Sequence, residues 1–295
     1  FLYIICTVMK FLWSTSFRSF GKSSNNDNIQ RIFLNSIKSL NIDAALFVTQ
    51  FGEVNVEDEI KKSGIKYFFK NAKNQIPINK KYSNKYMLKY SLEEFLKGDY
   101  DYYVHSTADL IIPSNIKNSL LNFNKKNLLF FIFPNNLVVN GKLLNPTMPL
   151  FGIDIFIYKI DKIKAQLFLD LVNDWNQYDW GVVDNFLIAV ADKMKLDFIN
   201  IYKNSNLIKF ENDFSALEED DKWQKDSWFE NNKYFLDFLK KNKLSTFYAR
   251  GSYYYLALKF FRIRDLNFNL IICYTKLLVN LLINFFKKIV SKKNY

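Results

Sequence analysis

The amino-acid sequence predicts an α/β protein with a mixed, mainly parallel sheet flanked by helices and a C-terminal amphipathic helical tail. Between residues 9 and 110, short apolar runs alternate with stretches whose apolar residues recur at helical spacing. Apolar residues make up 49% of the 295-residue chain, and the mean hydropathy of −0.13 fits a globular protein with a substantial core. Of the formal charge of +12, residues 240–295 hold +11, from twelve basic residues and one acidic residue. We therefore expect one domain over residues 9–240 and a basic tail over residues 241–295.

The first half of the domain is predicted to alternate between strands and helices. Residues 9–14 (MKFLWS) read as a buried strand, whereas residues 28–40 carry apolar side chains at the spacing of a helix face. The elements that follow are a strand at 44–49, a helix at 56–62 capped by Gly64, a strand at 65–69, a helix at 81–96 that ends at Lys97-Gly98, and a strand at 102–105. Strands joined through helices are expected to lie parallel, with the helices on the sheet faces.

The second half of the domain is less regular. Its predicted elements are strands at 128–133 and 149–158 around a turn-rich insert at 135–146, helices at 161–173 and 184–194, and a strand at 198–202. An acidic run at 218–221 is interpreted as a solvated loop. Because no internal repeat is found, these elements are assigned to the same domain as the first half.

The tail has the pattern of an amphipathic helix. Polar residues between positions 269 and 288 fall on one helical stripe, and Leu, Ile, Val and Phe fill most of the other positions. If this tract spanned a bilayer, Lys276 would sit near its middle at a cost of roughly 2.5–3.5 kcal/mol. A helix lying in the membrane interface avoids that cost, because its stripe faces water and its lysines meet anionic lipid. We expect such docking, with packing against the domain and spanning as the alternatives.

Composition excludes several kinds of chemistry. His105 is the only histidine, so a multi-histidine metal site is ruled out, and a Ser-His-Asp or Cys-His nucleophile would have to use this residue. His105 lies within an apolar strand, where a core histidine is expected. Cys6 and Cys273 are too few for a disulfide framework or a Cys-based zinc site. Residues 1–239 hold 29 basic and 28 acidic residues, so the body lacks the basic excess typical of nucleic-acid binding.

Polar residues follow two strands of the predicted sheet. The first strand runs into Ser14, Thr15, Ser16 and Arg18, and the fourth runs into Ser106-Thr107-Ala108-Asp109. Ligands of open α/β sheets bind outside the carboxyl ends of the strands. A carboxylate there can hold a divalent cation together with substrate phosphates. Asp109 has that position, although a cap of the following turn is an equally good interpretation.

Residues 100–113 (YDYYVHSTADLIIP) resemble the strand and metal-binding turn of GT-A-fold glycosyltransferases, which use nucleotide-diphosphate sugars. In that superfamily the strand follows the second or third helix and ends in a DxD-type motif, whose last Asp meets the metal and the diphosphate. Here the turn is Thr107-Ala108-Asp109, so only Asp109 matches. The resemblance implies Mn²⁺ or Mg²⁺ at Asp109, but the missing first carboxylate leaves one protein carboxylate for the ion, so the resemblance does not imply a strict dependence on metal. Asp99-Tyr100-Asp101 precedes the strand and is interpreted as its solvated start.

The order of elements extends the resemblance over about residues 9–205, and it implies roles for further residues. Residues 149–158 resemble the strand that borders the acceptor pocket, with Asp154 facing it. Residues 178–185 (YDWGVVDN) resemble the segment in which inverting members place the general base at a helix start. Asp184 matches that base, with Asp179 as the fallback, and Asp179 and Trp180 would border the acceptor. An ordinary first-turn acid, favoured by the helix dipole, is the alternative for Asp184.

The resemblance also implies a nucleotide-sugar site at the first strand. The hydroxyls of Ser14, Thr15 and Ser16 would meet the ribose or the base, and Arg18 a phosphate. Lys85, on the helix before the metal turn, would reach a phosphate as well. A plain polar loop and a solvated lysine are the alternatives.

The resemblance therefore implies a hexosyltransferase-like enzyme. It would move a sugar from a nucleotide-diphosphate donor to a hydroxyl of a glycan or lipid-linked acceptor, with inversion, in surface polysaccharide or lipopolysaccharide assembly. Its expected place is the cytoplasmic side, peripheral on the inner face of the cell membrane. Two alternatives stay open. A sugar-nucleotide nucleotidyltransferase would carry a Gly-rich, basic segment after the first strand, where residues 14–22 offer only Arg18, Gly21 and Lys22. A non-catalytic membrane-associated binding protein of the same fold is the other.

Overall fold

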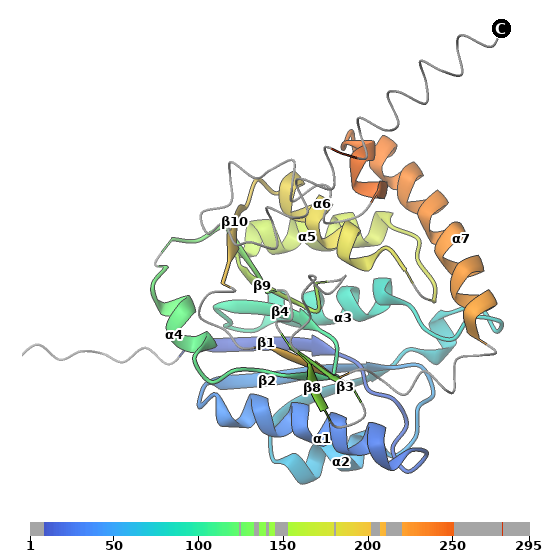
Figure 1. Cartoon of the computed structure of the whole chain (residues 1–295). Helices are drawn as coiled ribbons and strands as arrows, with labels where there is room; N and C mark the ends of the chain where they lie inside the picture. The colour runs from blue at the N-terminus through green and yellow to red at the C-terminus, as the bar shows by residue number, and fades with distance from the viewer. Residues whose placement is uncertain are drawn as a thin grey trace, which may run out of the picture.

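A computed structural model describes the following residues: 9–123, 125–132, 136–139, 142–144, 153–179, 181–201, 207–210, 220–250 and 279. At its centre lies a seven-stranded sheet with the order β10-β6-β9-β4-β1-β2-β3 (Figure 1). The strands are β1 (Lys10–Thr15), β2 (Asp43–Gln50), β3 (Lys66–Asn71), β4 (Tyr102–Ser106), β6 (Leu128–Ile132), β9 (Ile155–Lys159) and β10 (Asp197–Asn200). Only β9 runs antiparallel to its neighbours β4 and β6. The predicted mixed, mainly parallel sheet is confirmed.

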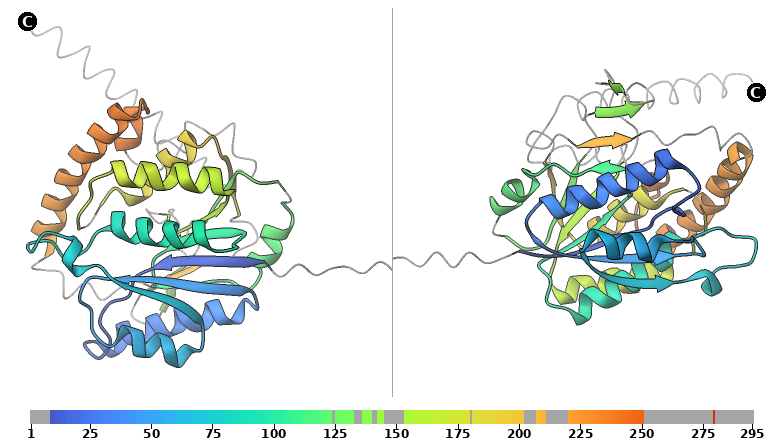
Figure 2. Two further views of the ribbon diagram at one scale, coloured as in Figure 1. Left: turned by 180° about the vertical axis from the view of Figure 1, so that it is seen from behind. Right: turned by 90° about the horizontal axis from the view of Figure 1, so that it is seen from below.

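Helices cover both faces of this sheet (Figure 2). They are α1 (Ser24–Ser39), α2 (Val56–Ser63), α3 (Asn84–Lys97), α4 (Ile116–Leu121), α5 (Lys162–Asp174), α6 (Val183–Lys193) and α7 (Asp220–Lys241). Alternation along β1 divides the core, because Phe11 packs in the cluster that contains Phe33 of α1, whereas Leu12 packs with Leu88 of α3 and Phe168 of α5. The helices α1 and α2 therefore cover one face, and α3, α5 and α6 cover the other.

A second, four-stranded sheet was not expected from the sequence. Its strands are β5 (Leu110–Ile111), β11 (Ile208–Phe210), β7 (Asn136–Val139) and β8 (Lys142–Leu144), in the order β5-β11-β7-β8. Since β5 begins immediately after the turn that follows β4, the antiparallel strand β11 is held beside that turn. Lys209 pairs in register with Leu110, and the Phe210 N–H donates to the Asp109 carbonyl at 2.9 Å.

The end of the domain differs in one respect from the prediction. Helix α7 begins at Asp220, so Asp220 and Asp221 belong to a helix, and their assignment to a loop was wrong. Acidic residues favour the start of a helix because its unpaired N–H groups carry partial positive charge. The apolar face of this helix packs inward, and the ring centroid of its Phe238 lies 5.2 Å from that of Phe186 in α6.

The predicted tail lies almost entirely outside the described residues. The last described elements are α7, which ends at Lys241, and a 3₁₀ helix at Thr246–Arg250. Residues 251–278 and 280–295 are not described, so the amphipathic tail helix stays a prediction. Within the described part of the chain, no helix combines the length and the apolar character needed to cross a membrane.

Candidate active site

Three aspartates and one lysine interact beyond the carboxyl end of β4. Asp109 lies in the turn after β4, Asp154 directly precedes β9, Asp184 stands in the first turn of α6, and Lys209 belongs to β11. Because β9 runs antiparallel to β4, it begins at the edge of the sheet where β4 ends. The Thr107 N–H donates to the Asp154 carbonyl at 3.2 Å, which joins the two segments.

Lys209 is the cation of this cluster. Its ammonium forms an ion pair and a hydrogen bond with the carboxylate of Asp154, whose side chain is only 9% exposed. Burial of Lys209 opposes its charge, but the carboxylates of Asp154, Asp109 and Asp184 outweigh this and raise the pKa of Lys209. The lysine therefore stays protonated at neutral pH. Since 27% of its side chain is exposed, a ligand can still reach it.

Asp184 has the electrostatics of a general base. Loss of hydration, followed by the neighbouring Asp154 carboxylate, raises the pKa of Asp184 to about 7, although the Ile153 N–H and Lys209 oppose this shift. The Ile153 N–H donates to Asp184 Oδ2 at 3.1 Å. The residue keeps part of its surface exposed, so an acceptor can approach it. A carboxylate that titrates near the working pH is the best proton acceptor available to an enzyme.

The local backbone fixes the direction of Asp184. Helix α6 starts after Gly181, at φ 114°, and Val182, at φ 55°. A positive φ is rare for a β-branched residue and costs of order 1–3 kcal/mol, which the surrounding packing must offset. Val182 is buried in the same core cluster as Phe186 and Phe238. The segment is thereby held in a turn that brings Asp184 to the Ile153 N–H.

Asp154 also departs from its ordinary protonation behaviour. Burial raises the pKa of Asp154, as does the charge of Asp109, while Lys209 acts in the opposite direction. The pKa values of Asp154 and Asp184 are thus both raised, and both carboxyl groups interact electrostatically with Lys209. Such arrangements are found at functional sites more often than in ordinary cores.

The residues around Asp109 do not fit the divalent ion that the resemblance implied. Protein sites for Mg²⁺ and similar ions use carboxylate oxygens that are open to the metal. Here the Asp154 carboxylate is taken by the Lys209 ammonium, and the first position of the turn is Thr107. Among the described residues, no three His, Cys, Asp or Glu side chains are grouped so that they could hold a metal ion.

Four of the residues predicted to bind the nucleotide sugar lie at the carboxyl end of β1, the strand next to β4. Ser14 and Thr15 are buried, Ser16 is half-buried and Arg18 is exposed. The Arg18 backbone is clamped by the Gln30 amide, which accepts from its N–H at 2.6 Å and donates to its carbonyl at 3.4 Å. The sheet thus brings this loop to the same edge as Asp109, with only Arg18 presented openly to solvent among the four.

Lys85 is engaged elsewhere. Its ammonium donates to the Asn173 carbonyl at 3.0 Å and to Asn176 Oδ1 at 3.5 Å. It therefore joins the start of α3 to the end of α5, where the carbonyl groups of a helix favour a cation.

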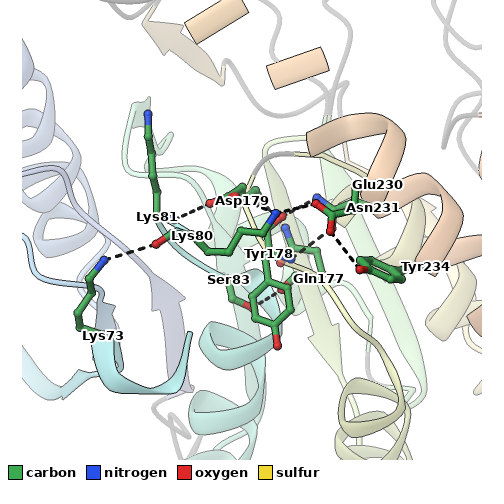
Figure 3. A network of polar contacts seen from close by, with 10 residues as sticks. All are labelled: Lys73, Lys80, Lys81, Ser83, Gln177, Tyr178, Asp179, Glu230, Asn231 and Tyr234. Carbon is green, nitrogen blue, oxygen red and sulfur yellow. Dashed lines mark hydrogen bonds and ion pairs between the residues drawn. The ribbon is translucent and has the colours of Figure 1, made fainter. Parts of the chain in front are cut away.

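Asp179 belongs to a separate polar network (Figure 3). It is 1% exposed, its Oδ1 accepts from the Lys81 N–H at 2.6 Å, and its Oδ2 lies 3.6 Å from Lys80 Nζ. Lys80 in turn pairs with Glu230 of α7 at 2.6 Å. The network ties the loop after α5 to the loop before α3 and to α7. Its neighbour Trp180, expected at the acceptor, lies outside the described residues.

His105 is a core residue, as expected. It is 7% exposed on β4, and burial lowers its pKa to about 4, so it is neutral at physiological pH. Asp99 and Asp101 lie at the other end of the strand, where both bond to Lys10 at the start of β1. Both positions agree with the sequence interpretation.

Lys209 was missed by the sequence analysis. It sits in a three-residue strand, IKF, that has too few residues for a recognisable period. The only available signal was a lone lysine between apolar residues.

The position of the turn supports the fold assignment. Strand β4 follows the third helix, and the Thr107-Ala108-Asp109 turn stands at the carboxyl edge of a mixed sheet, as the resemblance required. The fold is GT-A-like.

Comparisons with known proteins give structural similarity only. No protein-family model matches the chain, and no curated protein matches it. Glucosyl-3-phosphoglycerate synthase from Mycobacterium tuberculosis, solved with Mn²⁺, UDP and glucosyl-3-phosphoglycerate, is 15% identical over 81% of each chain, with a TM-score of 0.47. A nucleotide-diphospho-sugar transferase from Desulfovibrio desulfuricans is 12% identical over 82% of this chain and 98% of its own, with a TM-score of 0.43. The inositol-1-phosphate CTP transferase from T. maritima is 11% identical over 72% and 94%, with a TM-score of 0.44.

Proposed function

We propose that the protein is an inverting glycosyltransferase, which moves a sugar from a nucleotide-diphosphate donor to a hydroxyl of a glycan or lipid-linked acceptor. The single observation that carries the proposal is Asp184, a partly exposed carboxylate at the carboxyl edge of the sheet whose pKa is raised to about 7. A carboxylate with that proton affinity suits the removal of a proton from a hydroxyl.

The reaction follows from this assignment. The bond between the anomeric carbon and the diphosphate oxygen breaks, and its electron pair stays on the diphosphate. The acceptor oxygen bonds to the anomeric carbon from the opposite face, and its proton passes to the Asp184 carboxylate. Asp154 and Trp180 are proposed to border the acceptor, and the loop from Ser14 to Arg18 to hold the nucleotide.

The experiment that tests the function offers the purified full chain a panel of sugar nucleotides based on UDP, GDP and CDP, together with mixed glycan and lipid-linked acceptors. Transfer with inversion, detected by mass spectrometry and by the anomeric proton coupling of the product, is the expected result. Retention of configuration would contradict the base assignment. Release of pyrophosphate from a nucleoside triphosphate and a sugar phosphate, without any sugar transfer, would instead identify a nucleotidyltransferase.

We also propose that the basic tail holds the enzyme on the inner face of the cell membrane. The sequence supports this through its +11 charge over residues 240–295 and through the amphipathic pattern of residues 269–288. The test is co-sedimentation of the full chain and of a variant lacking residues 252–295 with vesicles of 30% anionic lipid (about physiological surface charge). The full chain is expected to bind and the truncated chain to stay in solution. Equal binding of both would contradict this placement.

A further inference from the structure

We propose that Lys209 replaces the divalent metal ion of this site, so that its ammonium contacts the diphosphate of the donor and the protein binds nucleoside diphosphates without metal. The inference rests on the proposed function. It arises from the mismatch between the metal expected at Asp109 and the lysine that the structure holds among the same carboxylates.

The position of Lys209 is built into the fold. Strand β11 is fixed on two sides, by its pairing with β5 and by its parallel pairing with β7. The Phe210 N–H bond to the Asp109 carbonyl then fixes the strand to the turn after β4. The turn itself is joined to Asp154 through the Thr107 N–H. Lys209 is therefore a fixed part of the edge where a diphosphate would bind, and its backbone moves only if the turn moves.

The ammonium retains donors for a ligand. It carries three N–H groups, and Asp154 is its one hydrogen-bond acceptor among the described residues. Two N–H groups can therefore turn toward phosphate oxygens. The Lys209 side chain is 27% exposed, whereas the Asp154 side chain is only 9% exposed. Asp154 thus anchors the lysine, and the lysine is the more accessible of the two to a ligand.

The same geometry disfavours a metal ion. A divalent ion close to Asp109 and Asp154 would have to displace the ammonium or lie beside it, and like charges a few ångströms apart in a partly buried site repel strongly. When the sugar leaves, negative charge grows on the diphosphate oxygen that takes the electron pair. A fixed ammonium stabilises this charge without any change in its own protonation state, since it stays charged throughout.

A binding experiment on the full chain separates this role from a merely structural one. Isothermal titration measures UDP, GDP and CDP, and the matching monophosphates, against protein stripped with EDTA and against protein supplied with Mn²⁺. We expect one diphosphate to bind the stripped wild type with an affinity within about threefold of that with Mn²⁺. Lys209→Met is expected to weaken that diphosphate about tenfold or more, but the monophosphate by less than about threefold, because the lost charged hydrogen bond belongs to the second phosphate.

A matched control exists on the surface. Lys125 pairs with Asp197 at 2.6 Å, as Lys209 pairs with Asp154, but it lies exposed between α4 and β6. Lys125→Met removes the same charge and keeps an aspartate unpaired, so it should leave both affinities unchanged. Lys209→Arg should retain diphosphate binding without metal. If Lys209→Met fails to fold, the wild-type titrations with and without Mn²⁺ still decide the question.

Each other outcome overturns the inference in a distinguishable way. Diphosphate binding that requires Mn²⁺ in the wild type would refute the role of Lys209 and leave the glycosyltransferase proposal standing. An equal loss of diphosphate and monophosphate binding in Lys209→Met would make the lysine a structural partner of Asp154 only. If no nucleotide binds with or without metal, the proposed function fails and this inference fails with it.

Discussion

Asp179 lies in the loop between α5 and α6, and Asp184 lies five residues later, in the first turn of α6. Each interacts with a lysine and accepts a hydrogen bond from a backbone N–H. Their surroundings are nevertheless opposite. Each oxygen of Asp179 has a partner: one accepts a hydrogen bond from the Lys81 N–H at 2.6 Å, and the other forms an ion pair with Lys80 at 3.6 Å, in a site that is 1% exposed. Asp184 has the Ile153 N–H on one oxygen, and loss of hydration together with the Asp154 carboxylate raises its pKa to about 7.

The contrast between the two sites distinguishes a carboxylate that stabilises the fold from one that can exchange a proton with a substrate. A buried carboxylate whose oxygens meet an N–H group and an ammonium holds segments of the chain together. A carboxylate beside another carboxylate keeps a high proton affinity and can exchange its proton with a substrate. We therefore propose that Asp179 stabilises the fold and that Asp184 takes part in the reaction.

The largest expected effect is that of Asp184→Asn on turnover. The amide has the same shape but cannot accept the hydroxyl proton, so kcat should fall by roughly 10²–10⁴, the usual contribution of a positioned general base. Donor affinity should change by less than about threefold, because the residue is proposed to act on the acceptor and not on the donor. Initial transfer rates and nucleotide titrations of the folded variant measure both quantities.

The matched control is Asp174→Asn, at the end of α5. Asp174 forms an exposed ion pair with Lys241 at 2.8 Å. This variant makes the same chemical change away from the cluster and should keep full activity. If Asp184→Asn retained more than about a tenth of the wild-type kcat, the residue would be an ordinary first-turn acid of α6.

The next effect is that of Asp179→Asn on folding. Asparagine tolerates the positive φ of 60° at this position, so the substitution removes the charge without adding backbone strain. The loss of the contacts to Lys80 and Lys81 should lower the free energy of unfolding by about 2 kcal/mol. Urea unfolding monitored by circular dichroism gives this quantity, and kcat at a temperature where the variant is folded should stay within about threefold.

Glu230→Gln tests whether burial sets the size of that effect. Glu230 is the half-exposed partner of Lys80 in the same network, and its loss should cost less than about 1 kcal/mol, because surface ion pairs contribute little. A stable but inactive Asp179→Asn protein would reverse the roles assigned to the two aspartates and make Asp179 the base.

A third effect concerns the dependence of the rate on pH. The base must be ionised, so kcat/KM should rise about tenfold per pH unit below 7 and level off above it. The titratable groups that interact with Asp184 are Asp154, Lys209 and Tyr158. Burial raises the pKa of Tyr158, and the nearby carboxylates raise the pKa of Lys209, so neither group titrates between pH 5 and pH 8. The inflection therefore belongs to the Asp154–Asp184 pair. A rate that is flat from pH 5 to pH 8 would exclude this pair from the reaction.

The sequence predicted the position of Asp184 better than the surroundings of Asp179. Asp184 could be placed at a helix start because the apolar period of residues 184–194 is local. The polar contacts of Asp179 could not be predicted, since its hydrogen-bond donor Lys81 comes from a loop 98 residues earlier in the chain. Helix α7, which completes that network through Glu230, was not predicted either.

In the fold as well, elements that depend on neighbouring residues could be predicted, whereas elements that depend on pairing between distant segments could not. Strands of the main sheet and the Gly64 cap, at φ 71°, follow from runs and residue types that a short window contains. The small sheet depends on pairing between β5 and β11, which are separated by about a third of the chain. The three-residue strand β11 is too short to show a hydrophobic period. The pairing of β11 with the distant strand β5 is what brings Lys209 to the site.

The smallest expected effect is the pH dependence of stability. The folded pKa of Asp184, about 7, lies above the ordinary value of 3.8, so the folded state binds the proton more tightly and the free energy of unfolding falls as pH rises from about 4 to about 7. Asp184→Asn removes this dependence and should be more stable than the wild type by about 1–2 kcal/mol above pH 7, since the residue is partly exposed and solvent screens its charge. At pH 4 the two proteins should unfold at the same urea concentration. A difference that stayed constant across this range would mean that Asp184 is ionised throughout, which would contradict a pKa near 7 for this residue.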